Sequence, residues 1–167
     1  MELYLLRHAI AVERGTPGHE VDSTRPLTPG GARKMQRIAA GMAKLDLKFD
    51  VILTSPYLRA RQTAEVVAVV FRMPNAVQVN EWLSPGSDQV RFLAELKERY
   101  GNRKGLLLVG HEPDLSELAS TLVCGSLDAT IDMKKGGLCH LSAASPHYGQ
   151  CAVLRCLLTP RQLALLG

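Results

Sequence analysis

Short apolar runs that alternate with longer amphipathic segments most constrain how this chain can fold. Three such runs, at residues 3–6, 51–53 and 106–109, are bounded by polar residues or glycine, as is typical of strands that are buried on both faces of a sheet. Between and after these runs, apolar residues recur with the 3.6-residue period of a helix. Four apolar helix faces are expected, formed by Ala32, Met35, Ile38, Ala39, Met42 and Leu45; Ala60, Ala64, Val67, Ala68 and Phe71; Val90, Leu93, Leu96 and Tyr100; and Leu115, Leu118, Ala119 and Leu122.

The end of the chain departs from this alternation. Residues 138–142 and 152–158 flank a turn-forming stretch at 146–149, which predicts an antiparallel hairpin at the edge of the sheet and can bring Cys139 opposite Cys156. Pro160 is expected to begin a short terminal helix. Strands that alternate with helices predict an α/β fold, a three-layer αβα sandwich whose central sheet is mostly parallel. A chain of 167 residues, 46% of them hydrophobic, fits a single domain over 1–167.

Composition narrows the function classes. Charged residues make up 22% of the chain and aromatic residues 5%, which argues against disorder and against an aromatic platform for nucleic acid. The 20 Lys and Arg exceed the 16 Asp and Glu but are scattered, a mild bias toward anionic partners. Arg7 and His8 interrupt the first apolar run, so we expect no export signal, no membrane span and a cytoplasmic location. The four cysteines lack zinc-site spacing and are expected to be buried thiols.

The ends of three predicted strands carry the candidate chemistry. The stretch "LYLLRHA" ends a strand with Arg7 and His8, and "LLLVGHEPDL" ends another with His111. Arg59 lies in the first turn of the helix that follows the strand at 51–53. Because ligands bind beyond the carboxyl ends of parallel strands, we expect these four side chains to meet at one edge. Two imidazoles and two guanidiniums favour a dianion, and a phosphoryl group fits best.

A neutral imidazole can attack phosphorus and form a phosphohistidine that water then hydrolyses. Arg7 and Arg59 would hold the non-bridging oxygens in such a reaction, and His111 would donate to the same oxygens. This scheme requires no metal ion and no other cofactor.

Four blocks of the sequence resemble the signature blocks of the histidine phosphatase superfamily, which has the phosphoglycerate-mutase-like fold. They are "LRHA", "RPLTPGG" at residues 25–31, "SPYLRARQTAE" and "VGHEPDL". The blocks occur in the order of the family and cover nearly the whole chain.

The resemblance implies a role for each matching residue. His8 would be the nucleophile that becomes phosphorylated, Arg7 and Arg59 would bind the phosphoryl group, and His111 would complete the pocket. The family often supplies a general acid from a carboxylate near the middle of the chain, for which Glu81 in "VNEWLSP" is the candidate. The alternative for Glu81 is a surface charge in a loop.

Other residues are weaker candidates for the mouth of the pocket. Arg25 and Thr28 can line it, but Thr28 can equally cap the helix that begins at Pro29, and Arg25 can be a surface residue. Lys134 and Lys135 can face an anionic substrate or be solvated surface lysines.

Only residues 9–26 and 82–88 remain as loops that could approach the site, which predicts a shallow pocket open to a phosphorylated side chain of another protein. Chain length and motif spacing resemble the SixA-type phosphohistidine phosphatases. That resemblance implies removal of a phosphoryl group from phosphohistidine on a partner protein, such as a histidine phosphotransfer domain or a phosphocarrier.

Three other functions stay open. The first is a broad phosphomonoesterase that acts on small organic phosphates. The second is a module that binds phosphate-bearing ligands without chemistry. The third is a metal hydrolase with His8, His111 and either Asp114 or Glu112 as ligands, which is disfavoured because Arg7 and Arg59 would repel the metal ion.

Overall fold

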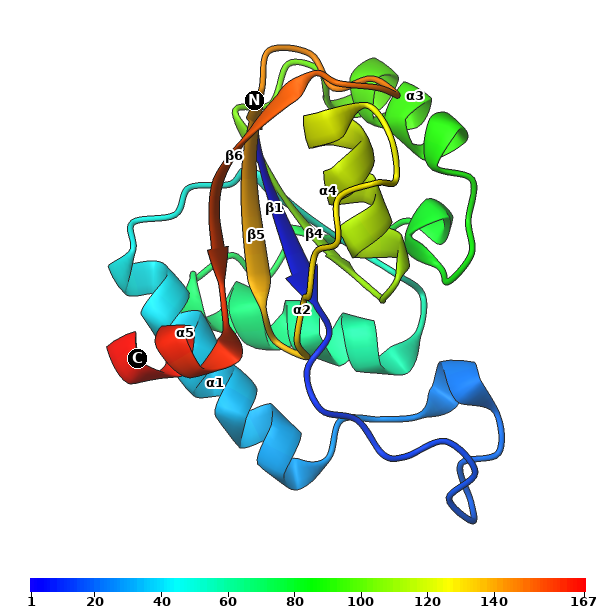
Figure 1. The fold of residues 1–167 in the computed structure, drawn as a ribbon. Coiled ribbons are helices and arrows are strands. Elements are labelled where there is room, and N and C mark those ends of the chain that lie inside the picture. The colour runs from blue at the N-terminus through cyan, green and yellow to red at the C-terminus, as the bar shows by residue number, and fades with distance from the viewer.

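The computed structural model describes all residues from 1 to 167 and contains a six-stranded sheet with helices on both sides (Figure 1). The strands are β1 (Glu2–Arg7), β2 (Val51–Thr54), β3 (Val77–Val79), β4 (Gly105–Gly110), β5 (Leu138–Ala143) and β6 (Ala152–Leu158). The α-helices are α1 (Pro29–Lys44), α2 (Leu58–Val70), α3 (Gln89–Tyr100), α4 (Asp114–Cys124) and α5 (Pro160–Leu166). Two short 3₁₀ helices, η1 (Asp22–Thr24) and η2 (Glu81–Leu83), lie in the connections.

The strand order is β3-β2-β4-β1-β5-β6, and the first four strands of that order run parallel. β5 pairs antiparallel with β1, and β6 pairs antiparallel with β5. The predicted three-layer fold, with a mostly parallel sheet and an antiparallel hairpin at its edge, is therefore confirmed.

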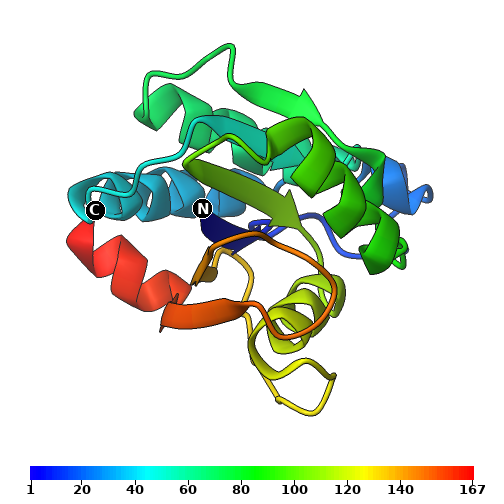
Figure 2. The ribbon, with the colours of Figure 1, turned by 90° about the horizontal axis from the view of Figure 1, so that it is seen from above.

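The helices divide into two layers, which Figure 2 shows on opposite faces of the sheet. Leu3 and Leu5 of β1 pack in a cluster with α3 and α4, whereas Tyr4 and Leu6 pack in a second cluster with α1, α2 and α5. Successive residues of a strand point to opposite faces, so the central strands are buried on both sides. No helix combines the length and the apolar character that crossing a membrane would need.

Some local expectations were wrong. β3 was not predicted, because it has only three residues, all outside the buried core, and therefore lacks an apolar run. Leu45 and Val90 are exposed, since each lies at a helix terminus, beyond the part of the helix that the sheet covers.

The cysteines also differ from the expectation. A register irregularity between His140 and Leu141 pairs His140 with Cys156, so that Cys139 lies opposite Leu157 instead. All four cysteines are free, and of these only Cys139 is fully buried.

The segment that follows β1 is fastened to the start of α1. The backbone amide of Thr28 donates to the carbonyl of Ile10 at 3.0 Å, and Ala11 forms an isolated bridge with Leu27. The Thr28 hydroxyl caps α1 by accepting from the amide of Gly31 at 2.9 Å. A Cβ atom on Gly31 would overlap the carbonyl oxygen of Ile10. The second glycine of "RPLTPGG" is thus required by this close backbone approach.

We predict opposite effects of alanine at the two neighbouring glycines. Gly31→Ala should lower the free energy of unfolding by about 2 kcal/mol or more, because its Cβ forces the segment after β1 away from α1. Gly30→Ala should be neutral or stabilising by up to about 1 kcal/mol, because nothing lies within 4 Å of its Cβ position and alanine favours a helix. Urea unfolding of both variants measures the difference, and equal stabilities would contradict the proposed packing.

Candidate active site

The carboxyl ends of β1, β4 and β2 lie side by side and form the floor of the site. Arg7 is in register with Gly110, and the pairing continues past the strands, because the amide of His8 donates to the carbonyl of Gly110 at 3.1 Å. The amide of Ser55 likewise donates to the carbonyl of Val109 at 3.0 Å. The residues that immediately follow the three strands are thus held at one edge of the sheet.

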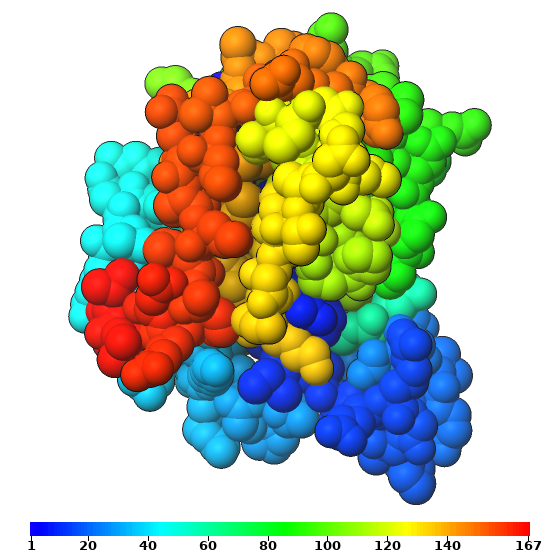
Figure 3. Space-filling view, viewed as in Figure 1, coloured from blue at the N-terminus to red at the C-terminus, as the bar shows by residue number.

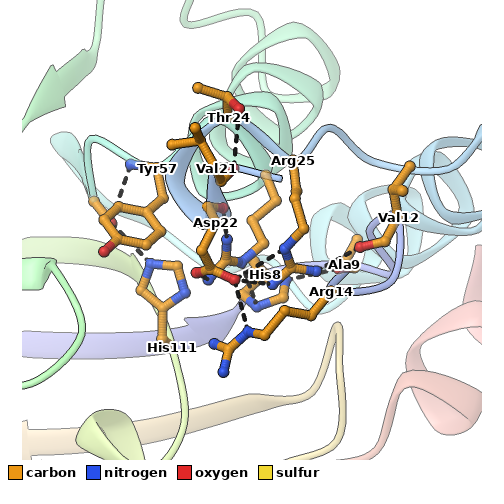
Figure 4. Close-up of polar contacts among 12 residues, drawn as sticks. His8, Ala9, Val12, Arg14, Val21, Asp22, Thr24, Arg25, Tyr57 and His111 are labelled. Atoms are coloured by element: carbon orange, nitrogen blue, oxygen red, sulfur yellow. Dashed lines mark hydrogen bonds and ion pairs between the residues drawn. The ribbon is translucent and has the colours of Figure 1, made fainter. Parts of the chain in front are cut away.

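His8 and His111 face each other at this edge, with ring centroids 5.1 Å apart (Figure 4). Only 7% of His8 and 3% of His111 is exposed. Burial lowers the pKa of His8 to about 3, aided by the charges of Arg59 and Arg7. Burial, followed by the neighbouring His8 and Arg59, also lowers the pKa of His111 to about 3. Both imidazoles are therefore neutral at neutral pH.

The hydrogen bonds of His8 define its tautomer. Nδ1 lies 2.7 Å from the carbonyl oxygen of Ala9, which can only accept, so Nδ1 carries the hydrogen. Nε2 then has a free lone pair, and it accepts from Nε of Arg59 at 3.2 Å. Nε2 is consequently the nitrogen of His8 that carries the lone pair.

His111 is oriented by Ser55, a residue that sequence reasoning did not single out. Ser55 Oγ lies 2.8 Å from Nε2 of His111 and accepts from the amide of Tyr57 at 3.2 Å. In the tautomer in which the Ser55 hydroxyl donates to Nε2, the hydrogen of His111 resides on Nδ1, which is buried and has no hydrogen-bond partner. The Tyr57 ring meets the imidazole edge to face at 5.1 Å. In that tautomer, Nδ1 of His111 is a donor without a partner.

The two arginines differ in their environments. Arg59 is 3% exposed, and its guanidinium lies over the ring of Tyr57, 4.9 Å from the ring centroid. Arg7 donates from Nη1 to the carbonyl of Met133 at 2.7 Å, while its Nε is buried without a partner. Arg7, and His111 in the tautomer protonated on Nδ1, therefore each retain a donor that a bound oxyanion could use.

Asp22, which the sequence analysis did not identify, lies at the centre of the arginine cluster (Figure 4). Its carboxylate accepts from Arg14, Arg25 and Arg59. Arg25 also donates to the carbonyl of Val12, so all its nitrogens bind within the segment after β1. In the space-filling view this segment (blue) projects from the lower edge of the molecule (Figure 3).

Glu81, the candidate general acid, makes its hydrogen bonds with residues close to it in the sequence. Glu81 begins η2 with an exposed side chain, and its backbone carbonyl accepts from Ser87 Oγ at 3.2 Å. Trp82 and Leu83, which follow it, line a small pocket together with His111. Glu81 makes no hydrogen bond with the histidines or arginines of the site, and it stays a candidate by its place in the chain.

Lys134 and Lys135 differ in the charged or titratable groups that they affect. Lys134 is paired with Asp132 at 2.7 Å. Lys135 lies close enough for its charge to contribute to the lowered pKa of His8. Lys135 therefore belongs to the electrostatic surroundings of the site.

The ligand set of the metal-hydrolase hypothesis is not gathered around a common point. No three His, Cys, Asp or Glu side chains are arranged so that they could hold a metal ion. Asp114, one of the proposed ligands, accepts instead from the amide of Gly86 at 2.8 Å.

Several known proteins are similar to this chain in sequence or in structure. The profile of the histidine phosphatase superfamily, branch 1, matches residues 3–83. An uncharacterized protein of Picosynechococcus sp. (strain PCC 7002) is 40% identical over 147 residues, which cover 87% of each chain. The phosphohistidine phosphatase SixA of Escherichia coli (strain K12) is 28% identical over 127 residues, or 75% of this chain and 76% of that protein. A structure of the protein histidine phosphatase SixA complexed with tungstate superposes with a TM-score of 0.82 at 23% identity, covering 98% of this chain and 99% of that one.

The buried histidines predict a pH dependence of stability. An unfolded histidine binds a proton near pH 6.5, whereas folded His8 does so only near pH 3. Between these values the unfolded state binds more protons, so the free energy of unfolding falls as the pH falls. His8→Asn should reduce this slope by about 1.4 kcal/mol per pH unit between pH 6 and 4. Urea unfolding across that range measures it, and a slope equal to that of the wild type would show that His8 is not held neutral.

Proposed function

The chain belongs to the histidine phosphatase superfamily, branch 1, and we propose that it removes the phosphoryl group of phosphohistidine on a partner protein through a phosphoenzyme formed on His8. The observation that carries the proposal is the state of His8. Its ring is neutral, Nδ1 is committed to Ala9, and the lone pair of Nε2 lies among guanidinium and imidazole donors.

The proposed reaction has two displacements. In the first, the lone pair of His8 Nε2 forms a bond to phosphorus, and the bond from phosphorus to the substrate imidazole, which carries a hydrogen on its other ring nitrogen, breaks with its electrons going to the leaving nitrogen, so that the substrate departs as a neutral imidazole. The His8 ring becomes cationic, and its Nδ1–H continues to donate to the carbonyl oxygen of Ala9, which stabilises the charge. In the second, water attacks phosphorus, inorganic phosphate leaves, and His8 returns to its neutral form.

The donors around His8 suit the non-bridging oxygens of the transferred group. Nε of Arg7 and Nδ1 of His111 are buried and unpartnered, and Arg59 lies against the nucleophile. Preorganised donors of this kind stabilise the charge of a transferring phosphoryl group without reorganisation during the reaction. Ser55 would act as a positioning residue, because it orients His111 without touching the substrate.

The choice of phosphohistidine as substrate rests on the leaving group and on a relative. An imidazole leaves from phosphorus with little or no help from an acid, and Glu81 makes no hydrogen bond with the histidines or arginines of the site. The Escherichia coli relative is named a phosphohistidine phosphatase, and we extend that activity to this chain as part of the proposal. A phosphomonoester would release an alkoxide, which needs a proton donor.

Labelled substrate tests whether the phosphoenzyme forms on His8. A histidine phosphotransfer domain that carries ³²P on its histidine should transfer the label to the wild-type protein as an acid-labile adduct at His8. His8→Ala should form no adduct and release phosphate at least about 10³-fold more slowly, because the nucleophile is lost. The control His147→Ala removes an exposed histidine from the turn between β5 and β6 and should leave labelling unchanged. Unaltered phosphate release by His8→Ala would reject the scheme.

Relative turnover of different phosphorylated compounds tests the choice of substrate. On one preparation, kcat/KM for the phosphohistidine protein should exceed that for a phosphoserine peptide or a sugar phosphate by at least about 100-fold, because those alkoxides need an acid. Glu81→Gln should change turnover of phosphohistidine by less than about twofold, since no proton donor is needed. Efficient turnover of the sugar phosphate, with its loss in Glu81→Gln, would instead identify a phosphomonoesterase.

A further inference from the structure

Each guanidinium nitrogen of Arg59 donates a hydrogen bond within the protein. Nε donates to Nε2 of His8 at 3.2 Å, Nη1 donates to the carbonyl oxygen of Asp22 at 2.7 Å, and Nη2 donates to Oδ2 of Asp22 at 3.1 Å. The lone pair that would attack phosphorus therefore faces Arg59, and the rest of the guanidinium holds Asp22. A phosphoryl group can bind between His8 and Arg59 only after part of this arrangement opens.

The carboxylate of Asp22 is bound as an oxyanion ligand would be. Oδ1 accepts from Nε of Arg14 at 3.0 Å and from Nε and Nη2 of Arg25 at 2.9 and 2.7 Å, while Oδ2 faces Arg59. Burial alone would raise the pKa of Asp22, but the hydrogen bonds from Arg25 and Arg14 and the charge of Arg59 outweigh it and lower the pKa to about 2. Asp22 is thus ionised at every pH at which the site would work. Three guanidiniums around one anion are a phosphoryl-binding arrangement.

Resting on the proposed phosphatase function, we infer that Asp22 is an internal competitor that occupies the arginines of the phosphoryl site and is displaced when a phosphoryl group binds. Only the fraction of molecules in which Asp22 has left can bind an oxyanion, so the competitor weakens binding of every oxyanion by the same factor. Inorganic phosphate, the product, binds to the same arginines. The return of Asp22 therefore favours its release.

The surroundings of Asp22 allow it to leave without disturbing the core. No residue from 12 to 26 is fully buried, and Val21, next to Asp22, is 60% exposed. The segment is fastened at its base by the bridge between Ala11 and Leu27. Movement of its tip therefore exposes little apolar surface, and the bound phosphoryl group replaces the negative charge that Asp22 supplied to Arg59.

The test measures oxyanion binding directly, by calorimetric titration with tungstate, a dianion, and with perrhenate, a monoanion of the same tetrahedral shape. Asp22→Asn should bind tungstate at least about tenfold more tightly than the wild type, the equivalent of one charge-assisted hydrogen bond. Asp22→Ser should act in the same direction and serves as a second variant should the first fail to fold. Perrhenate should gain the same factor as tungstate.

The matched control is Asp46→Asn. Asp46 is an exposed residue just beyond α1, paired with Lys48 at 3.1 Å, and its left-handed backbone conformation (φ of 54°) is one that asparagine adopts readily. This variant changes the net charge by the same amount, so tungstate affinity should stay within about twofold of the wild type.

Each other outcome has a definite meaning. Unchanged or weaker tungstate binding in both Asp22 variants, with binding to the wild type intact, would overturn the competitor role and leave the proposed function standing. A gain much larger for tungstate than for perrhenate would also overturn displacement, because it would indicate a stationary Asp22 that repels the dianion more. Absence of tungstate binding in every variant would instead overturn the phosphoryl site, and with it the proposed function.

Discussion

Backbone pairing that continues past the last strand residues is the constraint on which the site depends. The amide of His8 donates to Gly110, and the amide of Ser55 donates to Val109, so the first residues after three parallel strands are fixed by the same hydrogen-bond ladder as the sheet. Residues far apart in the chain are thereby placed within contact distance at no additional loop-ordering cost. A helical layer on each face excludes water from beneath this edge, and that exclusion lowers the pKa of both histidines.

The same exclusion of water makes a buried arginine destabilising unless a negative charge is placed beside it. Arg59 is almost fully buried, and an unpaired buried guanidinium would be strongly destabilising. Asp22 supplies the counter-charge, and it does so from a segment that contributes nothing to the core. The counter-ion of Arg59 therefore lies on a segment whose movement exposes little apolar surface. This placement is compatible with both a stable free protein and an accessible phosphoryl site.

How much of the structure can be predicted from the sequence depends on how far apart in the chain the interacting residues lie. The central strands and most of the apolar helix faces follow from local periodicity, and the meeting of Arg7, His8, Arg59 and His111 at one edge follows from the general geometry of parallel sheets. Asp22 could not be found in this way. Its partners lie in a loop and on α2, and the loop has no periodic pattern from which its path could be derived.

Ser55 was missed for a different reason. It lies in a block that was recognised, but its role depends on the rotation of the His111 ring and on the position of a hydroxyl hydrogen, which residue types do not specify. The three-residue strand β3 lacks the apolar run that marked the other strands, because only Val77 of its side chains packs against the core. Long-range pairing and side-chain rotation are thus the two kinds of information that residue patterns do not contain.

Burial of His8 also bears on the lifetime of the proposed phosphoenzyme. A ring that is phosphorylated on Nε2 and hydrogen-bonded through Nδ1 is cationic, and the desolvation that lowers the pKa of free His8 disfavours that cation as well. The charges of Arg59 and Arg7 add to this cost, and the hydrogen bond to Ala9 and the negative charge of the attached phosphoryl group offset it. Once water has attacked phosphorus, the ring regains its neutral form, which this environment favours, and its departure from phosphorus is thereby made easier. The environment that keeps the nucleophile ready therefore also limits how long the intermediate persists, as a hydrolase requires.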